Sequence, residues 1–269
     1  SSMLYGNIFN DSVTTNFMFR DKKEGVGVNF GIKTLVKPNE LNISFRPKAI
    51  FLNNRFNFNE ENYITLRSNG TINADVTLSN ESDAGMHLYT TPDGDSKLNA
   101  NLELFNIDLN ELTSVIPFVP NIAGILNLEL YLNKSKEDMM LSSDIRIDSV
   151  AYEGSHIGNE ALEIVYFPKN EKTHYLDILL SHNDEEVAHL SGDYLDDISD
   201  PGLKGEITLT RFPLGITRAF TQESGISLNG YVNSELSAEG KLSALSTNGF
   251  IQFDSVYLNA PLFGTDLHL

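Results

Sequence analysis

The sequence predicts a mainly β protein, an elongated antiparallel sheet with one or two short helices. Three observations lead to this prediction. Apolar residues recur at every second position over long stretches, which places them together on one face of a strand. Turn-forming residues separate these stretches, and only two short segments have the spacing of a helix. Strands with one apolar and one polar face are typical of antiparallel sheets.

The strands are predicted in order from this alternation. The hairpin signal Asn69-Gly70 stands between the alternating segments 63–66 and 71–74, and further turns are expected at 92–95 and 200–202. The clearest alternating runs are Val26, Val28, Phe30 and Ile32; Leu41, Ile43 and Phe45; Leu98, Ala100, Leu102 and Leu104; and Leu126, Leu128, Leu130 and Leu132.

Two short helices are predicted. In the first, 108–116, apolar residues recur at helical spacing, Asp108 is the expected N-cap with Glu111 three residues later, and Pro117 ends the helix. In the second, 213–220, Pro213 occupies the first turn, where the missing backbone N–H of proline is not needed.

Composition and charge exclude several classes of function. The chain has 19 Lys and Arg against 37 Asp and Glu, a net charge of −18, so we expect no binding to nucleic acid. It has no Cys, which removes disulfides, thiol nucleophiles and thiolate metal sites. No nucleophile elbow or phosphate-binding glycine loop is present, and we predict a protein that is not an enzyme and holds no cofactor.

Two acidic segments are weighed as metal sites. His182 and His189 flank 184–186, and four aspartates lie between 193 and 200. We interpret the first as a solvated hairpin loop and the second as a solvated turn, because the spacing of the aspartates differs from that of a calcium-binding loop. We therefore predict no metal site.

No targeting or membrane-spanning segment is predicted within the sequence. The N-terminus lacks the basic and apolar regions of a signal peptide. The longest charge-free stretch, 112–128, contains Pro117 and Pro120 and is a poor membrane span. We expect a soluble piece of a longer protein.

An internal repeat relates two regions of the chain. At an offset of 106 residues, Gly124 aligns with Gly230, Asn127 with Asn233, and the segment 148–150 with 254–256. The repeated unit contains a strand, a short helix and further strands, which indicates a sheet assembled by iteration. We predict three divisions of the chain: an N-terminal β-rich region, 1–101; a repeat, 102–206; and a truncated second repeat, 207–269.

The second copy carries a resemblance to a known family. It runs through Gly230, the segment Asn248-Gly249-Phe250-Ile251-Gln252-Phe253, and Pro261-Leu262-Phe263-Gly264. This order resembles the repeats of the TamB family, an AsmA-like family that includes the inner-membrane subunit of the translocation and assembly module. Relatives often carry a proline near the position of Leu245, and Lys134 stands where the second copy has Gly240. The resemblance covers the second half of the chain well. The first half shares only the general pattern of alternating strands.

The resemblance implies a fold, a compartment and partners. It implies a long β-sheet curled into a groove, anchored in the inner membrane and lying in the periplasm. It also implies phospholipid transport toward the outer membrane, support of outer-membrane biogenesis, and an outer-membrane assembly barrel protein as a partner.

The apolar stripes allow two interpretations. They form either the closed core of a β-sandwich, as in a secreted or cell-surface protein that binds glycan or protein through its loops, or the lining of an open groove that contacts lipid. We favour the groove because the stripes are nearly free of charge and only two short helices are available to cover them. The predicted lining is Val26, Val28, Phe30, Ile32, Leu41, Ile43, Phe45, Leu126, Leu128, Leu130, Ile145, Ile147, Val232, Leu236, Ile251 and Phe253.

The terminal segments predict self-association of this chain. If the sheet belongs to a longer array, residues 1–10 and 262–269 are edge strands, and neither segment carries the lysines or prolines that protect natural edges. We therefore expect end-to-end pairing, favoured by salt because the net charge opposes it.

Overall fold

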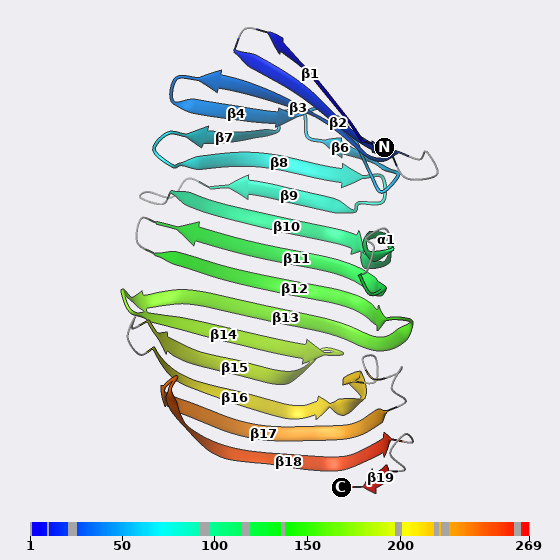
Figure 1. The fold of residues 1–269 in the computed structure, drawn as a ribbon, viewed down its shortest axis with the longest axis vertical. Helices are drawn as coiled ribbons and strands as arrows, with labels where there is room; N and C mark the ends of the chain where they lie inside the picture. The colour runs from blue at the N-terminus through cyan, green and yellow to red at the C-terminus, as the bar shows by residue number, and fades with distance from the viewer. Residues whose placement is uncertain are drawn as a thin grey trace. The chain divides into compact units, whose positions relative to one another are not determined.

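The structure is a computed structural model that describes residues 2–9, 11–20, 26–91, 97–114, 119–135, 138–196, 201–217, 221, 226–260 and 265–268. Nearly all of these lie in antiparallel strands, which confirms the predicted fold class (Figure 1). Two short helical elements are α1 (Leu109–Thr113) and the 3-10 turn η1 (Leu214–Thr217). The strands are β1 (Ser2–Phe9), β2 (Ser12–Arg20), β3 (Val26–Lys37), β4 (Glu40–Phe45), β5 (Lys48–Phe51), β6 (Asn54–Phe58), β7 (Tyr63–Arg67), β8 (Ile72–Asn80), β9 (Gly85–Thr90), β10 (Leu98–Asp108), β11 (Ile122–Lys134), β12 (Met139–Tyr152), β13 (Ser155–Asn170), β14 (Thr173–His182), β15 (Glu185–Leu195), β16 (Gly202–Pro213), β17 (Ser227–Lys241), β18 (Ala244–Ala260) and β19 (Thr265–His268).

Internal contacts divide the chain into two units. The first unit contains Ser1–Ile116 and Leu126–Met139, and the second contains Pro117–Ile125 and Met140–Leu269. The predicted boundaries after residues 101 and 206 stay predictions. Each unit is described by itself below.

The first unit is a meander whose long strands are broken in the middle. Strand β3 pairs with β4 through Ile32 and Phe45 and with β5 through Val28 and Phe51, so β4 and β5 lie end to end along β3. Strands β6 and β7 are arranged in the same way between that line and β8. The predicted hairpin at Asn69-Gly70 joins β7 and β8 and is confirmed.

One buried side chain connects the strands at the break. Asn62 accepts a hydrogen bond from the Phe45 N–H at 2.6 Å and donates to the Phe45 carbonyl at 3.0 Å and to the Asn59 carbonyl at 2.7 Å. The side chain therefore takes the place of a backbone ladder pair where the two broken strands separate.

We expect Asn62→Ala to lower the free energy of unfolding of the first unit by about 2–4 kcal/mol, because it leaves partly buried backbone groups of Phe45 and Asn59 without these partners. Chemical denaturation measures the loss. Asn57→Ala, at an exposed position of β6, is the control and is expected to have a small effect. An unchanged stability of the Asn62 variant would contradict this role.

The core of the first unit lies on one face of these broken strands. Ala49, Phe58, Val76 and Leu78 are buried, and the rings of Phe45 and Phe58 stack with centroids 4.6 Å apart. The remaining contributors are Phe30, Phe45, Phe51, Phe56, Ile64 and Met86. The broken strands thus build a local core out of aromatic residues of one sheet face.

In the second unit, each strand from β12 to β18 pairs antiparallel with the next one along the chain (Figure 1). The registers shift at bulges in β12 and β16. Ser149 and Arg211 have positive φ values of 55° and 46° at these bulges, as does Ser255 in β18 with 53°. Ser149 and Ser255 occupy corresponding positions of the predicted repeat.

Asparagine side chains bind the backbone at the bulges, and this feature recurs in the two repeats. Asn127 Oδ1 accepts a hydrogen bond from the Asn106 N–H at 3.0 Å, and Asn233 Oδ1 accepts one from the Arg211 N–H at 2.8 Å. Gly230 has φ 98°, and a Cβ there would lie 2.5 Å from the Ser255 carbonyl oxygen, so only glycine fits.

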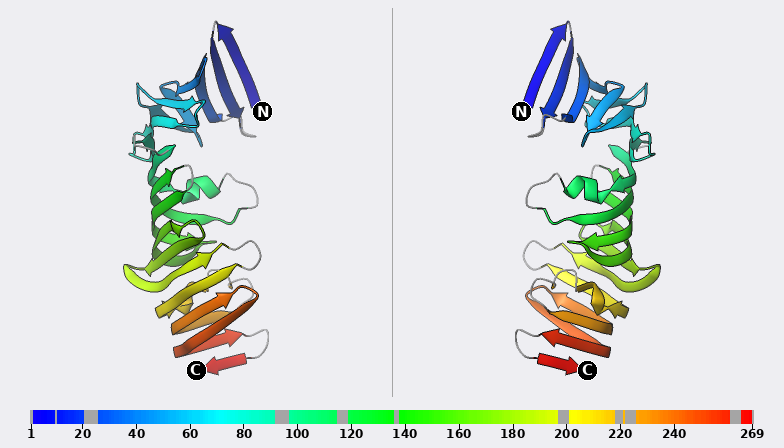
Figure 2. Two further views of the ribbon diagram at one scale, coloured as in Figure 1. Left: turned by 90° about the vertical axis from the view of Figure 1, so that its left-hand side faces the viewer. Right: turned by 90° about the vertical axis from the view of Figure 1, so that its right-hand side faces the viewer.

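Each of the two segments predicted as helices contains a short helical element. Asp108 caps α1 as expected and accepts from the Asn110 and Glu111 N–H groups, and α1 lies beside the strands rather than within the sheet (Figure 2). The Glu111 side chain accepts a hydrogen bond from Asn54 Nδ2. In the second segment Pro213 is the last residue of β16 rather than the first turn of a helix, and Leu214–Thr217 form a 3-10 turn. Residues 115–116 and 218–220 of the two predicted helices lie outside the described residues.

Candidate functional site: an apolar sheet face

The registers of the second unit bring apolar residues of many strands to one face. Ile145 pairs with Leu162, Leu162 with Leu180, and Leu180 with Ala188, so these four side chains form one row across the strands. A second row, which contains Ile164, Ile178, Leu190, Ile207 and Leu236, runs parallel to it. We call the whole surface the apolar face; it contains Leu141, Ile145, Ile147, Leu162, Ile164, Leu176, Ile178, Leu180, Ala188, Leu190, Ile207, Leu209, Val232, Leu236, Ile251 and Phe253.

This face is left open to solvent. Ile207, Ile251 and Phe253 keep 40, 56 and 51% of their surface exposed. Val232 is buried beside Phe253, but most of the face is only half-buried by its neighbours in the sheet. Within the described residues of this unit, the apolar face therefore lacks the covering layer that a sandwich core would have.

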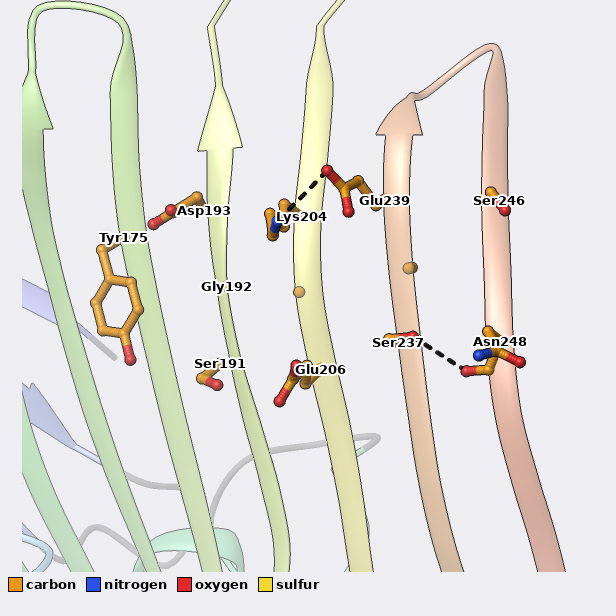
Figure 3. A pocket seen from close by; sticks show the side chains of 12 residues that line it. Tyr175, Ser191, Gly192, Asp193, Lys204, Glu206, Ser237, Glu239, Ser246 and Asn248 are labelled. Atoms are coloured by element: carbon orange, nitrogen blue, oxygen red, sulfur yellow. Dashed lines mark hydrogen bonds and ion pairs between the residues drawn. The ribbon is translucent and has the colours of Figure 1, made fainter.

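The opposite face of the same strands is polar. Tyr175, Asp193, Lys204, Glu239 and Ser246 form one row across β14 to β18 (Figure 3). With a neighbouring polar row they line a shallow depression of 610 Å³. The sheet therefore has two faces of opposite character, as the alternation predicts.

Ion pairs and hydrogen bonds connect the side chains of the polar face. Lys204 Nζ lies 3.4 Å from Glu239 Oε1, and Lys169 Nζ lies 2.6 Å from Asp193 Oδ1. The Tyr175 hydroxyl donates to Asp177 Oδ2 at 2.8 Å, and this hydrogen bond, with burial, raises the pKa of Tyr175. By their register, these groups lie on the face opposite the apolar rows.

In the first unit, six of the predicted lining residues share a face. Val28, Phe30, Ile32, Leu41, Ile43 and Phe45 lie on the same side of β3 and β4 by register. Phe30 and Phe45 pack against the local core, so some of this predicted lining is engaged in packing. The backbone of Val26 begins β3, but its side chain lies outside the described residues.

Leu126, Leu128 and Leu130 alternate along β11 with Asn127 and Glu129. The charge of Glu129 acts on Tyr89, whose pKa is raised by burial, by its hydrogen bond to Glu103 and by both carboxylates. Glu129 therefore lies on the polar face of the first unit, and the three leucines lie on the opposite face.

A series of consecutive hydrogen bonds lies at one end of the apolar face of the second unit. The Asn159 N–H donates to Asn183 Oδ1 at 2.9 Å, which fixes the orientation of that amide. Asn183 Nδ2 then donates to His182 Nε2 at 2.9 Å, so the ring proton of His182 is on Nδ1. This Nδ1–H donates to Glu160 Oε1 at 2.6 Å. Asn183 thus orients the His182 ring so that its Nδ1 faces the Glu160 carboxylate.

Aromatic side chains lie at the other end of the face. The Tyr166 hydroxyl and His174 Nδ1 are 2.9 Å apart, with the two rings stacked, and Tyr194 lies on the far side of His174. Tyr166 is six residues from Glu160 along β13, about 20 Å at 3.3 Å per residue. The apolar rows lie between these two polar ends.

The structure places the two histidines that were considered as metal ligands on opposite faces of the sheet. His182 contacts Glu160 on the apolar face, whereas His189 contacts Asp177 on the polar face at 3.1 Å. Of the four aspartates, Asp193 is paired with Lys169, and Asp197 and Asp200 lie outside the described residues. No cluster of three or more potential metal ligands is found among the residues that the structure describes.

Strands β12 to β16 contribute residues to the apolar face that were not predicted from the sequence. Their alternation is present in the sequence but is weakened by apolar residues such as Val165 and Leu179, which point to the polar face. The unselected residues of the face are Leu141, Leu162, Ile164, Leu176, Ile178, Leu180, Ala188, Leu190, Ile207 and Leu209.

Comparisons with known proteins give no identification. No family model matches the chain, and the searches of curated proteins and of solved structures give no match. Among the described residues, no helix is both long and apolar enough to cross a membrane.

Proposed function

We propose that this protein is a non-enzymatic scaffold that binds and transports phospholipid by holding the acyl chains on its apolar face. The observation that carries this proposal is the open apolar surface of the second unit, on which Ile207, Ile251 and Phe253 are partly exposed. Acyl chains bind by burial of apolar area, worth about 0.8 kcal/mol per CH₂, and need no charged partner.

The dimensions of the face support acyl chains as the ligand. The apolar rows extend about 20 Å along the strands between Glu160 and Tyr166. One leaflet of a bilayer has a hydrocarbon thickness of about 15 Å, half of the whole core. A single acyl chain lying along the strands would therefore be covered over most of its length.

The wider biological setting belongs to the same proposal. The resemblance of the second repeat to the TamB family supports a periplasmic location, an inner-membrane anchor in the full-length protein and an outer-membrane assembly barrel as a partner. The recurrence of the Asn127 and Asn233 contacts at the repeat spacing is in keeping with an iterated sheet of this kind.

Photo-crosslinking in cells tests the proposal. A photoreactive residue at Leu130 or Phe253 is expected to capture phospholipid, because both positions lie on apolar faces. The same residue at Asn127, on the polar side of β11, is the control. Capture from Asn127 alone would contradict the assignment of the lipid-binding face.

A second candidate function is glycan binding on the polar face. The depression lined by Tyr175, Ser191 and Asn248 combines an aromatic ring with hydroxyl and amide groups (Figure 3). A glycan array with the purified chain tests it. Specific glycan binding without lipid binding would favour this candidate and a secreted or cell-surface role.

A further inference from the structure

We infer that the apolar face selects amphiphiles whose head group carries an ammonium, such as a zwitterionic phosphatidylethanolamine, over anionic ones. This inference rests on the proposed function and adds a choice of head group to it. It depends on the charges at the Glu160 end of the face, which lies within the second unit.

The charges at this end are negative. Glu160 lies opposite His182, and His182 lies opposite Glu185, so the three side chains share one face. The side chains of Glu160 and His182 are only 18 and 15% exposed, which reduces the screening of the Glu160 charge by water. Glu160 and Glu185 thus flank His182 on this face, and His182 Nδ1 lies 2.6 Å from Glu160 Oε1.

The basic residues Arg146, Lys204 and Arg211 of these strands are paired with other carboxylates. Lys204 pairs in register with Glu239 and Asp193 on the polar face, and Arg146 lies opposite Ala161, also on that face. The Arg211 guanidinium stacks on Tyr231 and pairs with Asp254. An anionic head group at the Glu160 end would therefore meet carboxylates, whereas an ammonium would be attracted to them.

The position of these charges fits a head group. Leu162 and Leu180 lie two residues from Glu160 and His182 on the same face, so the acidic end joins directly to the apolar rows. With its acyl chain on Leu162 and Ile164, an amphiphile would place its ammonium beside Glu160 and Glu185.

A binding comparison with two lipids of identical acyl chains tests the inference. We expect the delipidated full chain to bind fluorescent phosphatidylethanolamine about tenfold more tightly than fluorescent phosphatidylglycerol at low salt, and the ratio to shrink as salt is added. The double variant Glu160→Gln, Glu185→Gln is expected to reduce this ratio to about two, as the local attraction for the ammonium is removed. Glutamine preserves the size of each side chain and still accepts a hydrogen bond from His182.

The matched control is Glu163→Gln, Glu206→Gln, which removes the same amount of charge from the polar face. We expect it to retain the tenfold ratio. Equal affinities of the unmodified chain for the two lipids, or an equal loss of selectivity in the control, would overturn the inference while leaving lipid binding intact. Absence of binding to both lipids would overturn the proposed function itself.

Discussion

Ile207→Asp is expected to weaken phospholipid binding about 100-fold, the largest functional effect of a single substitution. Ile207 lies between Leu190 and Leu236 in a central row of the apolar face. A carboxylate there would contact the hydrocarbon chain, and an ionised side chain surrounded by hydrocarbon costs about 2.5–3.5 kcal/mol. Titration with a fluorescent phospholipid measures the affinity.

The control for this variant is Asn248→Asp, which adds the same charge to the polar face. Asn248 is exposed and lies opposite Ser237. We expect near-normal lipid affinity in this control and a normal circular dichroism spectrum in both variants, because Ile207 is already partly exposed. Equal affinities of the two variants would show that the apolar face does not contact the lipid.

Phe58→Ala is expected to cause the largest loss of stability, about 3–5 kcal/mol in the free energy of unfolding of the first unit. The ring is 8% exposed and stacks on Phe45 in the local core. Its removal leaves a cavity among Ala49, Val76 and Leu78, which the backbone of the paired strands cannot readily close.

Denaturant unfolding followed by amide exchange measures where this loss occurs. We expect amides of β4 to β8 to lose protection, because these strands surround the core cluster. The exposed Val36→Ala in β3 is the control and is expected to change stability by less than about 0.5 kcal/mol. Equal stability of the two variants would contradict the assignment of this core.

The two units use the same alternating sequence in different ways. In the first unit the breaks around Asn62 allow aromatic residues of one face to pack together into a core. In the second unit the strands are continuous apart from bulges, and the corresponding face remains open. A large exposed apolar surface in a chain with a net charge of −18 is typical of a binding surface, since charge elsewhere keeps such a protein soluble.

The sequence by itself determined the fold class and the sidedness of the strands. Leu41, Ile43 and Phe45 share a face because side chains alternate along any strand, whatever its neighbours. The hairpin at Asn69-Gly70 and the cap at Asp108 were likewise predictable, since both depend on local backbone geometry.

The tertiary structure alone decided which apolar residues are covered and how the charges are arranged. Phe45 packs in a core while Phe253 stays exposed, although both have the same alternating context, because burial depends on the breaks and bulges that set the path of neighbouring strands. The orientation of the His182 ring toward Glu160 likewise depends on Asn159 and Asn183, which reach it only through the pairing of β13 with β14. Local sequence cannot specify these features, because they arise from contacts between residues far apart in the chain.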